Sequence, residues 1–136
     1  MSSGALTSVL CRADLRRGQI TLLKLLYERD EPIARKDLAK RLRGDIHEDY
    51  EQSLTGVLGA FGKRINASEK IHGNPGTGAF LRRQRIDGEL HYELLPEARK
   101  AIENVPALLQ KFEESWTDLL EPDTIIRASE LVPDTE

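Results

Sequence analysis

Apolar residues recur at helical spacing in the first half of the chain, and this pattern predicts three successive helices. The first spans residues 15–29 and ends before Pro32, because proline cannot continue the hydrogen-bond ladder of a helix. The second spans residues 34–42. The third spans residues 51–67 and has the clearest apolar stripe, which consists of Leu54, Val57, Leu58, Phe61 and Ile65. Residues 1–14 are expected to precede these helices as an N-terminal arm.

Residues 80–95 alternate between apolar and polar side chains on either side of Asp87-Gly88, and this pattern predicts a β-hairpin. A type I′ turn needs positive φ at both central positions, and Asp-Gly is one of its preferred pairs. Counting outward from the turn pairs Arg83 with Tyr92. One face then holds a core-facing set and two arginines near the tip, namely Leu81, Leu90, Tyr92, Leu94, Arg83 and Arg85. The other face presents to solvent Arg82, Gln84, His91 and Glu93.

Two prolines divide the C-terminal part of the chain into predicted helices. Pro96 begins a fourth helix that runs to about Val105, and Pro106 begins a fifth that extends to residue 121. The apolar residues of both helices have the spacing of a short coiled coil, and they are Ile102, Val105, Leu109, Phe112, Trp116 and Leu119. The last four of these predict a homodimer, with packing on the chain's own domain as the alternative. Residues 122–136 are acidic and are expected to form a disordered tail.

The composition fits a single folded domain. The chain has 136 residues, of which 39% are hydrophobic, and this length matches one ordinary domain. It has no apolar segment long enough to span a bilayer, and the basic residues near its N-terminus follow the apolar patch, the reverse of a secretory signal. A single cysteine, Cys11, excludes an internal disulfide framework and fits a reducing compartment. We therefore expect a cytoplasmic protein with no membrane partner.

Charge is distributed unevenly along the chain. The net charge is −3, but residues 11–100 hold 18 basic and 14 acidic residues, whereas residues 101–136 hold 2 basic and 9 acidic residues. The basic residues gather in two runs, 35–43 and 63–85. Clustered cations matter more than net charge for binding a polyanion, because screening limits the reach of each charge to about 8–10 Å. A solvated surface would also explain either run by itself.

The order of these elements, together with two sequence segments, resembles the winged helix-turn-helix family of DNA-binding domains. The segment GELHYELLPEARKAIENV, residues 88–105, is similar to the wing strand and following helix of MarR-like regulators. The segment DEPIARKDLAKRL, residues 30–42, is similar to the helix that precedes a recognition helix. Leu95 and Ala98 depart from the family pattern, in which threonine and glycine are usual. The resemblance covers residues 15–105 and implies a mainly α fold with a small β-hairpin wing, followed here by a C-terminal helix.

The resemblance further implies that the third helix enters the major groove of double-stranded DNA while the wing contacts the backbone or minor groove, as in a transcriptional regulator. The outer face of that helix carries Gly56, Gly59 and Ala60, which have no polar group to read a base edge, so we expect phosphate contacts to dominate. The candidate DNA contacts are Arg35, Lys36, Gln52, Thr55, Lys63, Arg64, Asn66, Arg82, Arg83, Gln84 and Arg85. The alternative is an interaction or scaffolding module, whose protein partner would bind the glycine face of the third helix or the C-terminal tail.

Other classes of function find little support in the sequence. The glycine-rich segment GNPGTG lacks the Gly-Lys-Ser/Thr ending of a phosphate-binding loop. His47, His72 and His91 lie far apart and have no cysteine or carboxylate at zinc-site spacing. A redox role for Cys11 is the alternative to simple packing, but the absence of a resolving cysteine favours packing. We therefore predict no catalytic residues, no metal site and no cofactor.

Overall fold

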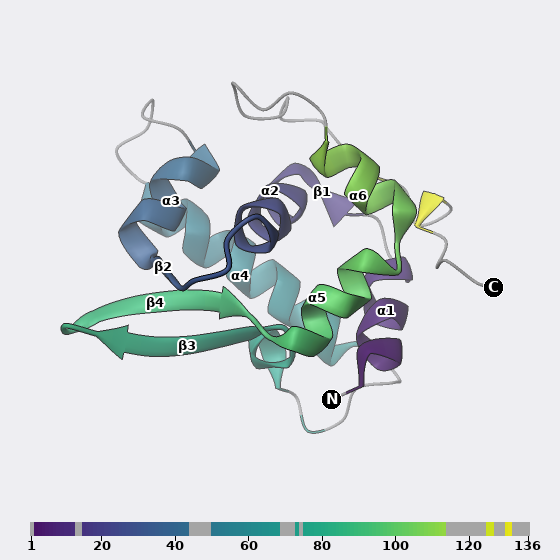
Figure 1. Ribbon diagram of the computed structural model, residues 1–136, viewed down its shortest axis with the longest axis horizontal. Helices are drawn as coiled ribbons and strands as arrows, with labels where there is room; N and C mark the ends of the chain where they lie inside the picture. The colour runs from purple at the N-terminus through teal and green to yellow at the C-terminus, as the bar shows by residue number, and fades with distance from the viewer. Residues whose placement is uncertain are drawn as a thin grey trace.

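The computed structural model has a mainly α-helical fold with a small antiparallel sheet (Figure 1). This confirms the fold class predicted from the sequence, and the order of helices and hairpin is compatible with a winged helix-turn-helix. The structure describes residues 2–12, 15–43, 50–68, 73, 75–113, 125–126 and 130–131. In chain order its elements are α1 (Ser3–Cys11), β1 (Leu15–Arg16), α2 (Arg17–Tyr27), β2 (Ile33–Ala34), α3 (Arg35–Arg43), α4 (Tyr50–Asn66), the 3₁₀ turn η1 (Gly76–Ala79), β3 (Leu81–Ile86), β4 (Glu89–Leu94), α5 (Pro96–Glu103), α6 (Pro106–Phe112) and β5 (Ile125–Ile126).

The helices α2, α3 and α4 correspond to the three predicted in the first half of the chain. The bounds of α3 and α4 each differ by one residue from the prediction, whereas α2 is preceded by strand β1 where the sequence pattern predicted helix. Helices α2 and α4 approach each other closely at Gly18. A Cβ atom built at Gly18 would lie 2.7 Å from Cγ2 of Val57, closer than packed carbon atoms approach. Glycine at this position therefore allows the two helices to cross.

The β-hairpin of β3 and β4 has the register and the turn that the sequence predicts. Arg83 pairs with Tyr92, and Asp87 and Gly88 have φ angles of 53° and 80°, as a type I′ turn requires. A third strand, β2, pairs with β4 on the side facing α3, so that Ile33 lies opposite Tyr92. The sequence did not predict β2, because a two-residue strand leaves too short an alternating pattern to recognise. The sheet anchors the base of the hairpin, and its tip projects from the body of the protein (Figure 1).

Helix α1 replaces most of the expected N-terminal arm and belongs to the domain. Its Leu6, Val9 and Leu10 are almost completely buried, and the helix packs against α5. The Ser2 side chain accepts a hydrogen bond from the backbone N–H of Ala5 and caps the helix start. The buried residues have the i, i+3, i+4 spacing of an amphipathic helix. The expectation of an arm outside the domain therefore missed a short helical signal.

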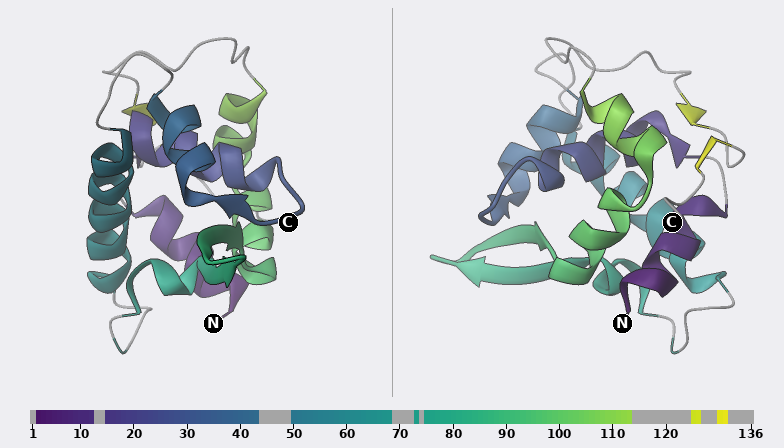
Figure 2. Two further views of the ribbon diagram at one scale, coloured as in Figure 1. Left: turned by 90° about the vertical axis from the view of Figure 1, so that its left-hand side faces the viewer. Right: turned by 45° about the vertical axis from the view of Figure 1, so that its right-hand side comes forward.

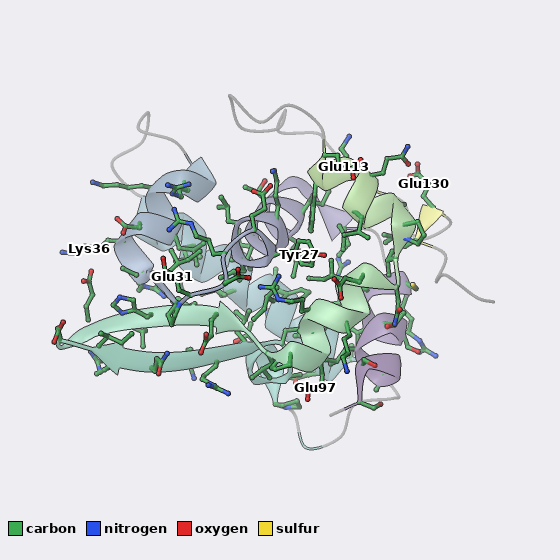
Figure 3. All side chains as sticks on the ribbon, in the orientation of Figure 1. Tyr27, Glu31, Lys36, Glu97, Glu113 and Glu130 are labelled. Carbon is green, nitrogen blue, oxygen red and sulfur yellow. The ribbon has the colours of Figure 1, made fainter. Side chains whose placement is uncertain are left out.

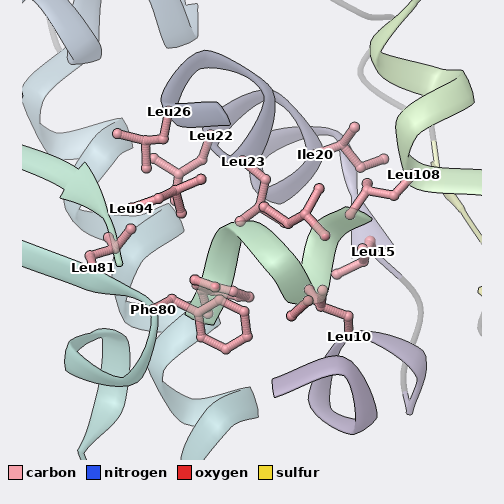
Figure 4. Close-up of a cluster of buried hydrophobic side chains, with 14 of the residues drawn as sticks. Leu10, Leu15, Ile20, Leu22, Leu23, Leu26, Phe80, Leu81, Leu94 and Leu108 are labelled. Carbon is pink, nitrogen blue, oxygen red and sulfur yellow. The ribbon is translucent and has the colours of Figure 1, made fainter. Parts of the chain in front are cut away.

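The hydrophobic core surrounds α2, which contributes Ile20, Leu22, Leu23 and Leu26 (Figure 4). Helices α1, α4 and α5 and the base of the hairpin supply the other walls. Phe61 of α4 meets Phe80, which precedes β3, with ring centroids 5.0 Å apart. Arg99 of α5 caps the C-terminal end of α2, because its guanidinium donates hydrogen bonds to the backbone oxygens of Tyr27 and Arg29 at 2.6 and 2.9 Å. This arginine therefore has a structural role.

The C-terminal segment is joined to the domain at the positions that the structure describes. Strand β5 pairs with β1, and Leu131 is buried in the core. These residues depart from the expected disordered tail, because the backbone of β5 pairs with β1 and the apolar side chain of Leu131 is buried despite the acidic composition of the segment. Within the described ranges, no helix has the length and apolar character needed to cross a membrane.

Helix α6 packs at least partly on the chain's own domain. Phe112 is buried, and its ring lies 5.7 Å from the ring of Tyr27. Leu109 is half-buried against the same core. Trp116 and Leu119, the other two predicted dimer contacts, lie outside the described residues. The part of the apolar stripe that is described therefore supports packing within the domain, which the sequence analysis left as the alternative.

Candidate nucleic-acid interface

Helix α4 lies along one edge of the molecule and presents one face outward (Figure 2, left). Its apolar stripe turns inward, with Leu54, Phe61 and Ile65 completely buried. On the outer side, Gly56 and Gly59 are exposed, and a Cβ atom at either position would contact nothing within 4 Å. Ala60 is exposed beside them. The outer face of α4, meaning Gly56, Gly59 and Ala60, is therefore an open strip with no polar side chain.

Arg35, at the start of α3, joins three elements near the N-terminal half of α4. Its Nη1 donates a hydrogen bond to the Tyr92 hydroxyl of β4 at 2.6 Å, and its Nη2 donates one to the Thr55 hydroxyl of α4 at 2.6 Å. The guanidinium carbon also lies 6.0 Å from the centroid of the Tyr92 ring. Both Arg35 and Thr55 were predicted DNA contacts. In the structure they bond to each other, and this holds α3, α4 and the hairpin in one arrangement.

Exposed lysine and arginine side chains continue beyond Arg35 on the outer side of α3. Lys36, Lys40 and Arg41 are exposed, and Lys36 lies at the outer edge of the molecule, above the hairpin (Figure 3). Lys36 is a predicted contact, and Lys40 and Arg41 belong to the same basic run, residues 35–43. Their spacing on α3, four and five residues after Lys36, puts Lys40 on the same helix face as Lys36.

The arginines of the hairpin lie on two different faces, as the predicted register requires. Arg82 shares its face with Gln84 and Glu93, and its Nη1 lies 3.4 Å from a Glu93 carboxylate oxygen. The Gln84 amide donates a hydrogen bond to the same oxygen at 3.4 Å. Glu93 therefore partly neutralises the charge that Arg82 could offer to a phosphate. Both Arg82 and Gln84 were predicted contacts.

Arg83 and Arg85 lie on the opposite face of the hairpin. Arg83 lies across from Tyr92, whose hydroxyl accepts the hydrogen bond from Arg35, so this face is turned toward α3. Both arginines are exposed, and the Arg85 Nη1 donates a hydrogen bond to the backbone oxygen of Gly88 at 3.2 Å in the turn. The structure thus places these two cations, rather than Arg82, on the side of the hairpin that faces the helices.

A second group of predicted contacts lies at the C-terminal end of α4. Lys63 is exposed and Arg64 is half-buried. The side-chain oxygen of Asn66 accepts a hydrogen bond from the Gly76 backbone N–H at 2.8 Å, so Asn66 fixes the turn η1 against the helix. Lys63 lies eight residues beyond Thr55, which is about 12 Å along a helix. The structure therefore separates these residues from the Arg35 group. The side chain of Gln52, in the first turns of α4, lies outside the described part.

Arg12, which no sequence pattern pointed to, joins this second group, because it lines a surface cavity together with Lys63 and Arg64. Arg12 follows α1 directly, so its place beside Lys63 and Arg64 depends on where that helix packs.

Cys11, next to Arg12, is half-buried, and burial raises the pKa of its thiol above the ordinary value. This favours packing over a redox role, because the reactive thiolate is less populated. Among the described residues, no three His, Cys, Asp or Glu side chains gather as they would around a metal ion.

Comparison of this chain with protein-family models, with curated proteins and with solved structures found no match. Its function is therefore inferred from the charges and the shape of the chain itself. The features that bear on function are the open outer face of α4, the exposed cations of α3, and Arg83 and Arg85 on the neighbouring face of the hairpin.

Proposed function

We propose that this protein binds double-stranded DNA through α4 and the β-hairpin and that it acts as a transcriptional regulator. The observation that carries the proposal is the placement of Arg83 and Arg85 on the hairpin face turned toward α3, where Lys36 and Lys40 are also exposed. Cations from two elements that are fixed relative to each other, α3 and the hairpin, can contact several phosphates at once. Arg35 supports this surface from within, because it holds α3, α4 and the hairpin together.

The outer face of α4 determines what kind of DNA contact is possible. Gly56, Gly59 and Ala60 offer no side-chain donor or acceptor, so they cannot distinguish base edges in the way that arginine, asparagine or glutamine does. They do allow the helix backbone to come close to the DNA. We therefore expect binding that depends mainly on phosphate contacts and is modest in its preference for sequence.

A titration of duplex DNA at several salt concentrations tests this proposal. Affinity should fall steeply with salt, because each phosphate contact releases counterions. Replacing Arg83 and Arg85 together by glutamine should weaken binding and remove roughly two phosphate contacts. The slope of log affinity against log salt concentration should then become less steep by about 1.8. Arg82→Gln is the matched control, since Arg82 lies on the other face and is paired with Glu93.

Binding of the Arg83/Arg85 variant that equals wild type at every salt concentration would overturn the assignment of this face. An equal loss in Arg82→Gln would show that the contact surface extends around the hairpin. Circular dichroism of each variant establishes that the fold is intact, which we expect because all three arginines are exposed.

A protein-interaction module is the second candidate, and the open glycines of α4 favour it. Small residues allow two helices to approach closely, and Gly56 and Gly59 have nothing within 4 Å of an added Cβ. A partner bound through this apolar strip would be held with little dependence on salt, in contrast to DNA. Gly59→Glu should abolish such an interaction, whereas DNA binding by wild type at low salt would instead support the first candidate.

We also propose that the protein forms a homodimer through the C-terminal part of the apolar stripe, namely Leu109, Trp116 and Leu119. The support is that the side chain of Leu109 is only half-buried and leaves surface for a partner, whereas Phe112 is buried within the domain. Sedimentation velocity on wild type and on Trp116→Ala measures the oligomeric state directly. A dimeric wild type that dissociates in the variant agrees with the proposal, and a monomeric wild type ends it.

A further inference from the structure

A surface cavity lies between α1, α2 and the C-terminal end of α4. Its volume is about 570 Å³, within the range of small-molecule sites. Three cationic side chains line it, Arg12, Lys63 and Arg64. The remaining lining consists of apolar and small residues and one amide, namely Val9, Ala60, Ala67, Ser68 and Gln19. The cavity thus combines positive charge with an apolar wall.

Gln19 is the unusual member of this lining. Only 6% of its surface is exposed, and its Oε1 is buried without a hydrogen-bond partner in the described structure. A buried amide oxygen that accepts no hydrogen bond costs free energy, and natural proteins rarely keep one without a reason. The last side-chain torsion of glutamine has a broad, roughly two-fold preference, so the amide can turn toward the cavity without leaving its rotamer. A ligand with an N–H or O–H group would then satisfy the oxygen.

We propose that this cavity binds a small organic anion that also carries a hydrogen-bond donor. The anionic group, a carboxylate or phosphate, would lie among Arg12, Lys63 and Arg64. The donor would reach the amide oxygen of Gln19, and the hydrocarbon part of the ligand would lie against Val9 and the alanines. An uncharged apolar molecule would leave Gln19 unsatisfied, and an inorganic anion would leave the apolar wall uncovered.

Binding at this cavity would also affect DNA binding. This consequence rests on the proposed function, whereas binding of the anion does not. Lys63 and Arg64 are candidate contacts for DNA phosphates and also line the cavity. An anion held between them lowers the positive potential that this end of α4 offers to DNA. The ligand should therefore weaken DNA binding, and DNA should weaken binding of the ligand by the same factor, because the coupling of two binding equilibria is reciprocal.

A set of N-acetyl amino acids tests the proposal, because each carries a carboxylate and an amide N–H at its α-carbon, and its apolar side chain increases in size through the set. The full chain, labelled with ¹⁵N, is titrated with N-acetylglycine, N-acetylvaline and N-acetylphenylalanine at millimolar concentration, and the side-chain amide signals of Gln19 are followed by NMR. At least one acid should shift these signals in a saturable way. The matching N-acetyl amino acid amides are neutral, and 3-phenylpropanoate is an anion without an N–H, so both should bind at least tenfold more weakly.

Two variants complete the test. Gln19→Leu removes the unpaired amide, so it should fold at least as stably as wild type, as judged by its midpoint of thermal unfolding, and lose most of its affinity for the acid. Lys63→Gln should also weaken binding of the acid. Lys100→Gln should leave this binding unchanged, because Lys100 is an exposed residue of α5 that does not line the cavity.

The proposal is overturned if no acid shifts the Gln19 signals, if the neutral amides bind equally well, or if Gln19→Leu keeps wild-type affinity. A ligand that binds in the NMR titration of a protein that does not bind DNA would contradict the proposed function alone. A weakening of DNA binding by the acids without a change at Gln19 would show an effect of ionic strength, and this too would overturn the site.

Discussion

Arg35 and Lys36 are adjacent basic residues, yet the structure gives them different roles. The two terminal guanidinium nitrogens of Arg35, Nη1 and Nη2, donate hydrogen bonds to the hydroxyls of Tyr92 and Thr55, whereas Lys36 is exposed. The planar guanidinium suits this role, because it directs two N–H groups toward two fixed acceptors at once. Proximity in sequence therefore says little about whether a basic residue can reach a phosphate.

Substitution of Arg35 and Lys36 by glutamine separates these two roles. Arg35→Gln should lower the free energy of unfolding by about 1–3 kcal/mol, because the buried Tyr92 hydroxyl loses its partner, and it should weaken DNA binding indirectly. Lys36→Gln should leave the free energy of unfolding unchanged. It should remove about one phosphate contact, so that the slope of log affinity for DNA against log salt concentration becomes less steep by about 0.9. Urea unfolding and DNA titration measure both quantities. A stable Arg35→Gln protein would mean that the two hydrogen bonds contribute nothing net.

Cys11 provides a second prediction about a single residue, because burial raises the pKa of its thiol. Its reaction with iodoacetamide at pH 7.0–8.0 (about one unit below the ordinary thiol pKa) should be slower than that of the same protein unfolded in urea, and the rate should keep rising with pH above the range in which a free thiol levels off. Alkylation followed by mass spectrometry gives the rates. Equal rates in the folded and unfolded protein would contradict this prediction.

Among the elements, α1 was not predicted from the sequence, whereas the open face of α4 was. The nine residues of α1 bury three large apolar side chains, so this segment carries part of the core. The outer face of α4, in contrast, leaves helical glycines with no packing that requires them. Each of these two features predicts a change in stability, one a loss and the other a gain.

Leu10→Ala should lower the free energy of unfolding by about 2–5 kcal/mol, because it leaves a cavity in the core at a completely buried position. Ser8→Ala, in the same helix, is the matched control, since Ser8 is only half-buried and its hydroxyl bonds locally to the Gly4 backbone oxygen at 3.2 Å. Ser8→Ala should change the free energy of unfolding by less than about 1 kcal/mol. Urea unfolding of both proteins is sufficient. Similar, small effects would indicate that α1 is an arm after all.

Gly59→Ala should raise the free energy of unfolding by up to about 1 kcal/mol, because alanine has the higher helix propensity and an added Cβ meets nothing within 4 Å. If α4 approaches DNA closely, the same methyl group should weaken DNA binding. A more stable protein with weaker binding is therefore the expected result, measured by urea unfolding and DNA titration. Unchanged affinity would show that this part of the helix does not approach the DNA backbone.

At the scale of the whole molecule, segments far apart in the sequence close the domain together. Strand β5 near the C-terminus pairs with β1 near the N-terminus, and Leu131 is buried. Strand β5 and Leu131 thus belong to the same folded unit as β1 and the core.

Leu131→Ala tests this closure. It should lower the free energy of unfolding by about 2–5 kcal/mol if Leu131 is packed as tightly as its exposure of 1% indicates. Glu130→Ala is the matched control, because its side chain is exposed, and its effect should remain within about 1 kcal/mol, the range of an exposed polar interaction. Urea unfolding compares the two. If both changes are equally small, the C-terminal segment contributes little to the fold.

The sequence determined the elements whose signals are local. The periodicity of α3 and α4, the Asp87-Gly88 turn with its register, and the prolines that begin α5 and α6 all depend on neighbouring residues, so each was predicted to within a residue or two. The sequence also separated Arg82 from Arg83 and Arg85, because side chains alternate strictly along a strand.

Only the tertiary structure decided which of the basic residues are available and what the ends of the chain do. The bonds of Arg35 reach residues 20 and 57 positions away, and strands β1 and β5 pair across most of the chain. Such contacts depend on where whole elements pack, which no local pattern encodes. The cavity beside Gln19 has the same origin, because α1, α2 and α4 must come together before Arg12 and Lys63 share a surface.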